Sequence, residues 1–402
     1  MRILILTQWF DPEPTLKGLA FANSLVARGH MVHVITGFPN YPGGKLYPGF
    51  KIKLLEREVR GNLEIWRVPL VTSHSHSRFG RVANYLSFMI TAFVAGMFAT
   101  KPQVIYAYNP PLTVGLTAVL VSRLRRVPVL CDVQDLWPDT LRATSMVVNP
   151  WILRIVDIIS VRVYQAMSRI SVLSEGFRHI LIARGIADTR LLYIPNWAPP
   201  ELEGCPTPKP SNDGRPLLAL FAGTMGKAQA LESVILAIDL VNQDGALVEL
   251  ALVGSGIEKE NLKLFVDRQA IPRVRFLPPV KLSDMPPLLA AADILIVHLA
   301  DDPLFAITVP SKTQAYLAAG RPIIMAVRGD AARMITNAEA GICADPCNPT
   351  SIADALRRLA LASSAERDRM GRNGREFYDE YLHSSVGAKR FGEALEGLTA
   401  CG

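Results

Sequence analysis

The sequence predicts an α/β protein with two similar halves, each built on a parallel sheet, that face each other across a cleft. Three observations lead to this fold class. Short apolar runs, typical of buried parallel strands, alternate with helix-length segments along both halves of the chain. A proline-rich, polar stretch, 198–216, interrupts this alternation and is typical of a domain linker. The chain of 402 residues is also too long for one ordinary hydrophobic core.

The first half, residues 1–197, opens with a strand, a long loop, a helix and a second strand, which is the order of a right-handed parallel unit. Its first loop ends in Gly18 at the start of a helix, so we expect Gly18 to contribute to an anion or sugar site. The strands expected in this half are Arg2–Thr7, Met31–Thr36, Val104–Tyr108, Val127–Val133, Ile170–Leu173 and Leu191–Ile194.

The same alternation restarts after the linker, and the second domain is expected to span residues 217–383. A helix within about residues 384–402 is expected to cross back to the first domain. The strands expected in the second domain are Leu217–Ala222, Val248–Val253, Val274–Leu277, Ile294–Val297 and Pro322–Val327.

The loop and helix between the last two of these strands form the most informative stretch. About a dozen residues precede the helix, where roughly 2–6 are usual, and long loops at the carboxyl ends of parallel strands bind ligands. Pro310 sets the helix start, and Ser311 with Gln314 has the spacing of a capping box. Lys312 adds a charge at the positive end of the helix dipole, which suits a phosphate group. A capped surface helix with a solvated lysine is the alternative.

A second loop in the same half, Gly223–Lys227, has similar chemistry. Gly223 and Gly226 let the backbone approach a ligand closely, and Lys227 supplies a charge, although a simple glycine turn would look the same. Two lysines at two helix starts favour a diphosphate site. No Walker loop, no GxGxxG fingerprint and no pair of aspartates separated by one residue occurs, so we expect neither a metal nor another cofactor.

The composition indicates which kinds of partner and which cellular compartment to expect. Basic residues number 43 and acidic residues 36, and this mild excess fits an anionic ligand or an anionic membrane surface. No interleaving of aromatic and basic residues suggests single-stranded nucleic acid, so no nucleic-acid partner is expected. The five cysteines are scattered and odd in number, which indicates a reducing compartment.

Two polar stretches in the first half are candidates for binding a ligand. The loop 36–50 is rich in glycine, proline and aromatic residues, and Asn40, Tyr41, Tyr47 and Phe50 could bind a sugar; a rigid surface loop is the alternative. The stretch DVQDLWPD lies at the carboxyl end of a predicted strand and contributes five candidates, although they could equally cap the next turn. These candidates are Asp132, Gln134, Asp135, Trp137 and Asp139.

The segment Val82–Ala99 carries no charge, and Arg78, Arg81 and Lys101 flank it. A buried core helix, a helix resting in one membrane leaflet and a true span compete. A strand resumes at Val104, so we discount the true span. If the segment rests on a membrane, charges introduced at Phe88 and Phe93 should release it.

Five separated motifs carry a resemblance that covers nearly the whole chain. They are GFPNYPGGKLYPG, DVQDLWPD, RISVLSEGF followed by IPNW, GKAQALESVILA and DDPLFAITVPSKTQAYLAAGRPIIMA. The sequence is similar to the WbuB-like branch of glycosyltransferase family four, retaining enzymes with the two-Rossmann GT-B fold. The resemblance implies a nucleotide-diphosphate sugar donor, most often a UDP-sugar, with an N-acetylated amino or deoxyamino sugar as a candidate. It implies a sugar acceptor on polyprenyl diphosphate, and a peripheral protein on the cytoplasmic face of the bacterial inner membrane.

The resemblance also suggests roles for individual residues. Catalysis is expected to rest on Lys227, Lys312, Asp135 and Gln134, with front-face transfer and the lysines on the leaving diphosphate. The acceptor is expected on Asn40, Tyr41, Trp137 and Asp139. The donor is expected on Gly18, Gly223, Thr224, Gly226, Gly254, Val280, Phe305, Thr308, Ser311, Thr313 and Gln314.

The sequence departs from the family pattern at the positions that usually carry charge. Ile307 and Ala315 replace two glutamates, so Gln314 is the nearest polar candidate for the donor ribose. Thr224 takes the place of an arginine, and Gln134 that of a histidine, which removes a general base because an amide cannot accept a proton. Two other functions therefore compete with sugar transfer: a non-hydrolysing nucleotide-sugar epimerase and an inactive sugar-nucleotide-binding subunit.

Overall fold

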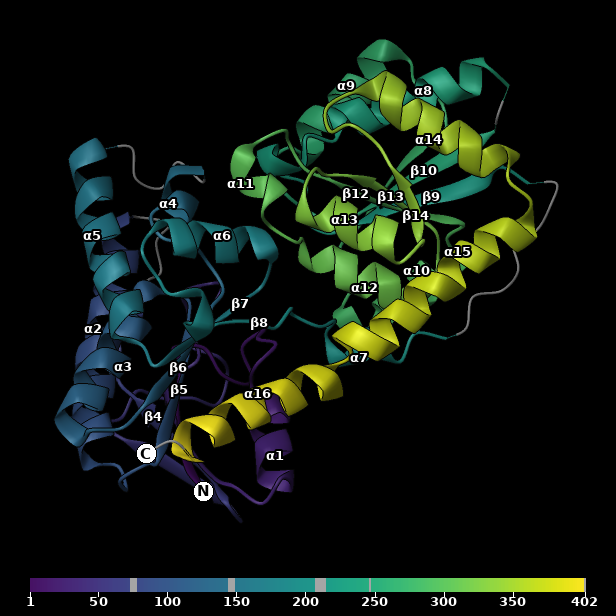
Figure 1. Ribbon diagram of the computed structural model, residues 1–402. Helices are drawn as coiled ribbons and strands as arrows, with labels where there is room; N and C mark the ends of the chain where they lie inside the picture. The colour runs from purple at the N-terminus through teal and green to yellow at the C-terminus, as the bar shows by residue number, and fades with distance from the viewer. Residues whose placement is uncertain (73–77, 144–148, 207–214, 246, 401–402) are drawn as a thin grey trace. The chain divides into compact units, whose positions relative to one another are not determined.

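The protein forms two compact α/β units, seen in a computed structural model that describes residues 1–72, 78–143, 149–206, 215–245 and 247–400 (Figure 1). Unit 1 consists of Met1–Pro195 and Gly387–Gly402, and unit 2 of Asn196–Val386. Each unit has its own sheet with helices packed on it, so the predicted α/β class with two parallel-sheet domains is confirmed.

Unit 1 contains an eight-stranded sheet in the order β3-β4-β2-β1-β5-β6-β7-β8. All neighbouring strands are parallel except β3 and β4, which form an antiparallel edge that the sequence patterns did not indicate. The sequence of β3, EREVR, is polar and mostly exposed, so it lacks the apolar run by which buried strands are recognised. The strands are β1 (Arg2–Leu6), β2 (Met31–Gly37), β3 (Glu56–Arg60), β4 (Leu63–Val68), β5 (Val104–Asn109), β6 (Val129–Val133), β7 (Arg169–Val172) and β8 (Leu191–Tyr193).

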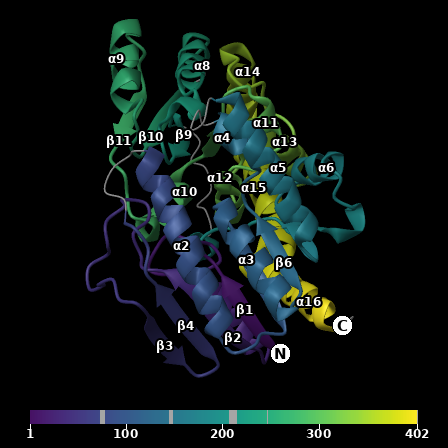
Figure 2. The same cartoon turned by 90° about the vertical axis from the view of Figure 1, so that its left-hand side faces the viewer.

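Three long helices, α2, α3 and α5, lie side by side on one face of this sheet (Figures 1 and 2). The guanidinium of Arg125, in the last turn of α3, donates to the carbonyl oxygens of Gly96, Met97 and Ala99 at 2.8, 3.1 and 2.6 Å and so caps the end of α2. The helices of unit 1 are α1 (Leu19–Ala27), α2 (Arg78–Phe98), α3 (Leu112–Arg125), α4 (Asp139–Ala143), α5 (Pro150–Ala166), α6 (Glu175–Ala183), η1 (Asp188–Arg190) and α16 (Ser384–Ala400).

Helix α2 is neither wholly buried nor wholly exposed. Phe88 and Ala92 are fully buried, whereas Phe79 and Phe98 are 89% and 80% exposed. Phe88 therefore faces the core, and the expectation that it lies on a membrane-facing side is wrong. Within the described residues, one helical segment, Phe79–Phe98, is long and apolar enough to cross a bilayer. The strand that follows it, β5, pairs with β1 in the same sheet, so α2 belongs to the fold of unit 1.

The last helix, α16, completes the core of unit 1. The ring of Phe391 packs edge-on against Phe21 of α1 and Tyr106 of β5, with centroids 5.6 and 5.4 Å apart. Near its end, Glu396 accepts hydrogen bonds from Arg28 at 3.0 Å and contacts His30 at 2.9 Å. These contacts fix the end of the chain against its first helix.

Unit 2 contains a six-stranded, entirely parallel sheet in the order β11-β10-β9-β12-β13-β14. Its strands are β9 (Leu217–Ala222), β10 (Val248–Val253), β11 (Val274–Leu277), β12 (Ile294–His298), β13 (Ile323–Ala326) and β14 (Gly341–Cys343). Its helices are α7 (Pro200–Glu203), η2 (Lys227–Gln229), α8 (Glu232–Gln243), α9 (Lys259–Gln269), η3 (Leu282–Asp284), α10 (Met285–Ala291), α11 (Pro303–Ala306), α12 (Ser311–Ala319), α13 (Asp330–Asn337), α14 (Pro349–Leu361), α15 (Ser364–Phe377) and the π-helical turn η4 (Tyr378–Leu382).

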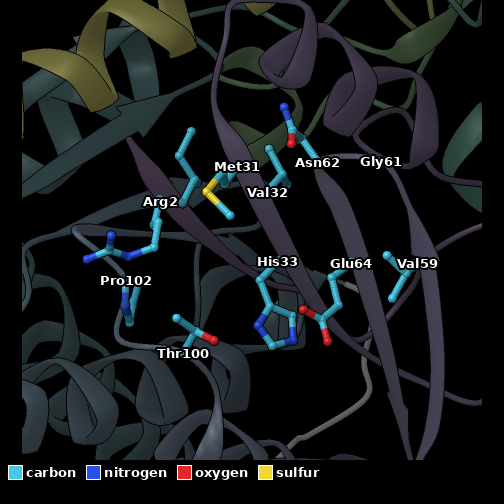
Figure 3. A pocket seen from close by; sticks show the side chains of 11 residues that line it. Arg2, Met31, Val32, His33, Val59, Gly61, Asn62, Glu64, Thr100 and Pro102 are labelled. Carbon is cyan, nitrogen blue, oxygen red and sulfur yellow. The ribbon is translucent and has the colours of Figure 1, made fainter.

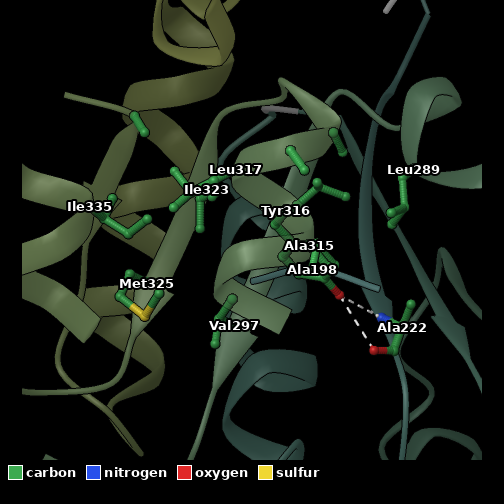
Figure 4. Close-up of a cluster of buried hydrophobic side chains, with 14 of the residues drawn as sticks. Ala198, Ala222, Leu289, Val297, Ala315, Tyr316, Leu317, Ile323, Met325 and Ile335 are labelled. Atoms are coloured by element: carbon green, nitrogen blue, oxygen red, sulfur yellow. Dashed lines mark hydrogen bonds between the residues drawn. The ribbon is translucent and has the colours of Figure 1, made fainter. Parts of the chain in front are cut away.

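Helix α12 is anchored to the sheet by a buried tyrosine (Figure 4). The hydroxyl oxygen of Tyr316 accepts the backbone N–H of Ala222 at 2.9 Å, and its ring lies in an apolar cluster with Val297 and Leu317. Ala222 is the last residue of β9, so this bond fixes the helix beside the loop that follows β9. A buried tyrosine usually hydrogen-bonds its hydroxyl in this way.

The predicted linker 198–216 is wrong for residues 198–206. Ala198 and Leu202 are buried in the core of unit 2, and Glu203 accepts hydrogen bonds from the hydroxyl of Tyr378 and the N–H of Ser384, both at 2.7 Å. The prolines suggested a linker, but Pro200 occupies the first position of α7, where proline is favourable. Residues 207–214, the rest of the stretch except 215–216, lie outside the described residues.

Candidate donor and acceptor sites

The predicted donor residues of unit 2 lie in the loops and short helical segments that follow β9, β10, β11 and β12, at the carboxyl edge of the sheet. The first two loops are joined backbone to backbone. The N–H of Met225 donates to the carbonyl oxygen of Ser255 at 2.8 Å, and the N–H of Gly223 donates to that of Val253, also at 2.8 Å. Gly254 has a φ of 139°, and a Cβ there would overlap the carbonyl oxygen of Gly223. Glycine at this position therefore permits a rigid double loop.

Lys312 lies against this double loop from the first turn of α12. Its ammonium sits 4.6 Å from the ring centroid of Phe221, and a Cβ on Gly223 would come within 2.8 Å of it. Burial lowers the pKa of Lys312 from 10.5 to about 8. No carboxylate pairs with this ammonium in the described part of the chain. The structure thus holds a half-buried cation, beside flexible backbone and a helix N-terminus, with its charge uncompensated.

We expect this lysine to make nucleotide binding pH-dependent. A diphosphate binds the ammonium form, so the Kd for UDP should be nearly constant below the pKa of about 8 and should rise above it. Calorimetric titration with UDP between pH 6.5 and 9.5 measures this. In Lys312→Met the rise should disappear, and a rise that persists there would assign it to another group.

The start of α12 differs from the predicted capping box. Pro310 occupies the cap position, Ser311 is the first helical residue, and no side chain caps the helix. Gln314 is 2% exposed, and with its amide oriented to donate it reaches the carbonyl oxygens of Pro310 and Ser311 at 3.0 and 3.2 Å. Its prediction as a ribose ligand is therefore wrong, because the side chain is already used. Thr313 is also fully buried and offers no accessible hydroxyl.

The remaining predicted residues of this site differ in how accessible they are to a ligand. Lys227 and Thr224 are exposed, whereas the N–H of Gly226 is taken by the side-chain oxygen of Gln229 at 3.0 Å. The hydroxyl of Thr308 donates to the carbonyl oxygen of Leu304 at 2.8 Å, which removes its proton from a ligand. Val280 and Phe305 are partly buried and pack on the core.

His298, at the end of β12, is a positioning residue that sequence reasoning missed. Its Nδ1–H donates to the carbonyl oxygen of Gln229 at 2.7 Å, and its Nε2 accepts the N–H of Cys347 at 3.0 Å. Burial lowers the pKa of His298, so the ring is neutral and this tautomer is favoured. It holds the turn that contains Lys227. The only signal in the sequence is a histidine that ends an apolar strand.

In unit 1 the corresponding edge is organised by a buried ion pair. The ammonium of Lys17, in the first loop, lies 2.6 Å from Asp132 of β6, and both side chains are fully buried. The hydroxyls of Tyr106 and Ser171 donate to the same carboxylate at 2.7 and 2.8 Å. These bonds tie the first loop to three strands of the sheet.

The predicted anion site at Gly18 is wrong in this structure. The N–H of Leu19, the first residue of α1, donates to the carboxylate of Asp11 at 2.5 Å. A Cβ on Gly18 would overlap that carboxylate. The positive end of the helix is therefore occupied by an acid of the chain itself.

Glu13 joins the first loop to the loop 36–50. Its carboxylate accepts the backbone N–H groups of Phe10, Asn40 and Tyr41 at 3.1, 2.8 and 2.7 Å. Burial raises the pKa of Glu13 to about 7, with the N–H donors acting in the opposite direction. This residue was not predicted, because only the fold brings the two loops together.

Of Asn40 and Tyr41, the two acceptor residues predicted in this loop, only Tyr41 is accessible. Its ring is stacked on Trp9, with centroids 4.4 Å apart, and the residue is 39% exposed. Asn40 is buried: its amide donates to the carbonyl oxygen of Phe38 at 2.9 Å, and its side-chain oxygen accepts from Asn84 at 3.2 Å. The expectation that Asn40 binds acceptor is therefore wrong.

The stretch after β6 supplies one acid to the site. Burial raises the pKa of Asp135. Burial also raises the pKa of Tyr41, and the charge of Asp135 adds to this shift, so the two candidates lie in one electrostatic environment. Asp139 is ion-paired with Arg184, so it is not free to bind acceptor as predicted. The carbonyl oxygen of Trp137 accepts from Arg184 at 3.2 Å, and Gln134 is half-buried.

A separate cavity of unit 1 lies at the opposite, amino edge of the sheet (Figure 3). It has a volume of about 100 Å³, and Arg2, Met31 and His33 line it. This volume holds a few water molecules but no sugar nucleotide. Among the described residues, no group of three or more histidine, cysteine, aspartate or glutamate side chains could hold a metal ion.

Comparisons with known proteins agree with this geometry. The family model described as "Glycosyl transferase 4-like domain" matches residues 19–197, and that described as "Glycosyl transferases group 1" matches residues 216–361. WcaI of Escherichia coli (strain K12), whose name places it among glycosyl transferases of colanic acid biosynthesis, is 24% identical over 337 residues, which are 80% of this chain and 82% of WcaI.

Two solved structures show the same fold. Sucrose-phosphate synthase from Thermosynechococcus elongatus matches with a TM-score of 0.72 and 17% identity over all of both chains. Anabaena HepE in complex with UDP-glucose matches with a TM-score of 0.65 and 14% identity over 99% of this chain and 100% of HepE. Two glycosyltransferase domain models match in succession, over residues 19–197 and 216–361, and the chain has the GT-B fold, so we conclude that it is a glycosyltransferase.

Proposed function

We propose that this glycosyltransferase moves a sugar, with retention, from a UDP-sugar to a lipid-linked sugar in the assembly of a bacterial surface polysaccharide. The observation that carries the donor half of this proposal is the uncompensated ammonium of Lys312 beside the Gly223 and Gly254 loops. Two similarities support it: HepE, which shares the fold, has been seen with UDP-glucose, and WcaI is named for polysaccharide biosynthesis.

The transfer step follows from the groups available. Lys312, Lys227 and the N-terminus of α12 stabilise the negative charge that develops on the departing diphosphate. The acceptor hydroxyl attacks the anomeric carbon on the face from which UDP leaves, and its proton passes to a diphosphate oxygen. This route needs no histidine base, in agreement with Gln134 at the position where relatives have one.

The acceptor half of the proposal rests on unit 1. Tyr41, stacked on Trp9, presents an aromatic surface suited to a sugar ring, and Asp135 can accept a sugar hydroxyl. We place the protein on the cytoplasmic face of the inner membrane, since a lipid-linked acceptor is held there. The exposed apolar side of α2 is consistent with a peripheral contact.

A panel of UDP-sugars, incubated with and without a short polyprenyl-diphosphate sugar, tests the proposal. Acceptor-dependent release of UDP, with formation of an α- or β-linkage that retains the donor's configuration, is the expected result. Interconversion of the donor sugar without acceptor would indicate an epimerase. Binding of UDP with no turnover on any acceptor would indicate an inactive binding subunit.

We expect turnover to continue in an excess of EDTA. Lysines and helix ends, rather than a divalent cation, neutralise the diphosphate in the proposed step. The rate of UDP release is measured before and after chelation, with manganese added back. Complete loss that manganese restores would show that a metal shares this role.

A further inference from the structure

Helices α2, α3 and α5, which lie side by side (Figure 2), carry many exposed apolar side chains. We call their combined surface the three-helix face. It is formed by the exposed side chains of Phe79, Val82, Leu86, Ile90, Val94, Phe98, Leu120, Leu124, Trp151, Ile152, Ile155 and Ile158. An exposed apolar surface of this extent marks an interaction site rather than ordinary solvent-facing surface.

The charge of the three helices indicates which class of partner binds the three-helix face. Their sequences contain six arginines but only one acidic residue, Asp157. Exposed apolar side chains together with an excess of arginines are complementary to a leaflet that contains anionic lipids. A soluble protein partner would need an equally apolar and acidic surface, whereas an anionic membrane offers both properties at once.

A groove of about 630 Å³ opens within this face between α3 and α5. Its walls are mainly apolar, with Val119 and Leu120 on α3 and Val163 on α5. Two arginines complete it, Arg123 on α3 and Arg162 on α5. Both are exposed, neither has an acidic partner within the described residues, and no acid lines the groove.

We propose that this groove binds one anionic phospholipid, with its phosphate on Arg123 and Arg162 and an acyl chain along the apolar walls. The volume is in the range of small-ligand sites. Two guanidinium groups can share one phosphate through several charge-assisted hydrogen bonds. This inference deepens the membrane contact of the proposed function and does not depend on which sugar is transferred.

The topology separates this lipid from the acceptor. Helix α3 ends at Arg125 and leads into the start of β6, and α5 ends at Ala166 and leads into the start of β7. The arginine end of the groove therefore lies toward the amino edge of the sheet. Asp135 follows β6 at the carboxyl edge, so the groove lipid is a docking lipid and not the reacting one.

The test uses a short-chain lipid below its micelle concentration. Calorimetric titration of the full chain with dihexanoyl phosphatidylglycerol should show one site, and the double variant R123Q/R162Q should bind at least tenfold more weakly. The matched control R126Q/R154Q removes two exposed arginines of the same helical region that do not line the groove, and it should bind within twofold of wild type. Unchanged melting curves show that both variants are folded.

One further variant and two further titrations identify the ligand. The variant A166W fills the groove without changing charge and should also weaken phosphatidylglycerol binding. Glycerol 3-phosphate should bind at least tenfold more weakly than phosphatidylglycerol, because it has no acyl chain. Dihexanoyl phosphatidylcholine should also bind at least tenfold more weakly, because its choline ammonium cancels the net charge of the headgroup and repels Arg123 and Arg162. Three results would each overturn the proposal. One is that R126Q/R154Q weakens phosphatidylglycerol binding as much as R123Q/R162Q does. The others are that glycerol 3-phosphate binds as tightly as phosphatidylglycerol, or that the protein forms a lipid-independent dimer that covers the three-helix face.

Discussion

Lys312→Ala is expected to lower kcat/KM for a UDP-sugar by roughly a hundredfold, about 3 kcal/mol of transition-state stabilisation, as for other preorganised groups that bind developing charge. Its ammonium is half-buried beside the Gly223 loop and has no acidic partner in the described part of unit 2. Lys227→Ala should have a smaller effect, roughly tenfold, because water screens an exposed charge. Initial rates with varied UDP-sugar give kcat and KM separately.

The stability of the protein provides an independent readout for a second substitution of Lys312. A buried ammonium without a counter-charge destabilises the folded state, which is why its pKa falls to about 8. Because the folded-state pKa is below the unfolded value, this unfavourable contribution is fully present at pH 7 and is relieved only as the pH rises. Lys312→Met should therefore raise the melting temperature of the ligand-free protein while it lowers activity, the pattern of a functional residue.

The control for this experiment is Lys263→Ala. Lys263 lies on α9 and pairs with Glu260 at 2.9 Å on the surface, so its removal changes the net charge equally. Activity and melting temperature should both stay close to wild type. Near-normal turnover in both Lys312→Ala and Lys227→Ala would show that the donor diphosphate binds elsewhere.

Asp132→Asn is expected to destabilise the protein by about 3–5 kcal/mol, because it leaves the fully buried ammonium of Lys17 without its counter-charge. Tyr106 and Ser171 donate to different oxygens of Asp132, and the amide keeps only one of them, so the loss includes one hydrogen bond besides the ion pair. Urea unfolding, followed by a signal from unit 1, gives the shift in midpoint.

A surface pair gives the matched comparison. Arg178 and Asp188 form an exposed ion pair at 2.7 Å, and Asp188→Asn should leave the urea midpoint nearly unchanged, because water screens an exposed pair. The double variant Lys17→Met with Asp132→Asn should recover part of the loss, because no buried charge remains. Equal effects of Asp132→Asn and Asp188→Asn would mean that the buried pair does not anchor the first loop.

The parts of the structure that the sequence predicted well depend on short-range patterns. Strands β9, β10 and β11 have the predicted limits, because each is an apolar run with polar or flexible residues on both sides. Helix α3 was missed because it is apolar on nearly all sides and so lacks the period of an amphipathic helix. The hairpin of β3 and β4 was missed because an exposed edge strand needs no apolar run.

The site was predicted less well, because hydrogen bonding of buried polar groups depends on distant partners. Gln314 and Asn40 looked available for ligands, but the fold gives each of them partners within the chain. Glu13 and Lys17 did not stand out, and their roles depend on residues 27 and 115 positions away. A buried polar group requires such partners, and a sequence does not show which groups the fold will bury.

By itself, then, the sequence determined the α/β class and the lysines at two helix starts, since strand patterns and helix ends are set by neighbouring residues. Only the tertiary structure decided which polar groups remain for a ligand. It paired Asp11 with the start of α1, Asp139 with Arg184, and Lys17 with Asp132, and it left Lys312 uncompensated. The physical reason is that charge compensation inside a protein is a property of three-dimensional neighbours, and residues far apart in the chain provide them.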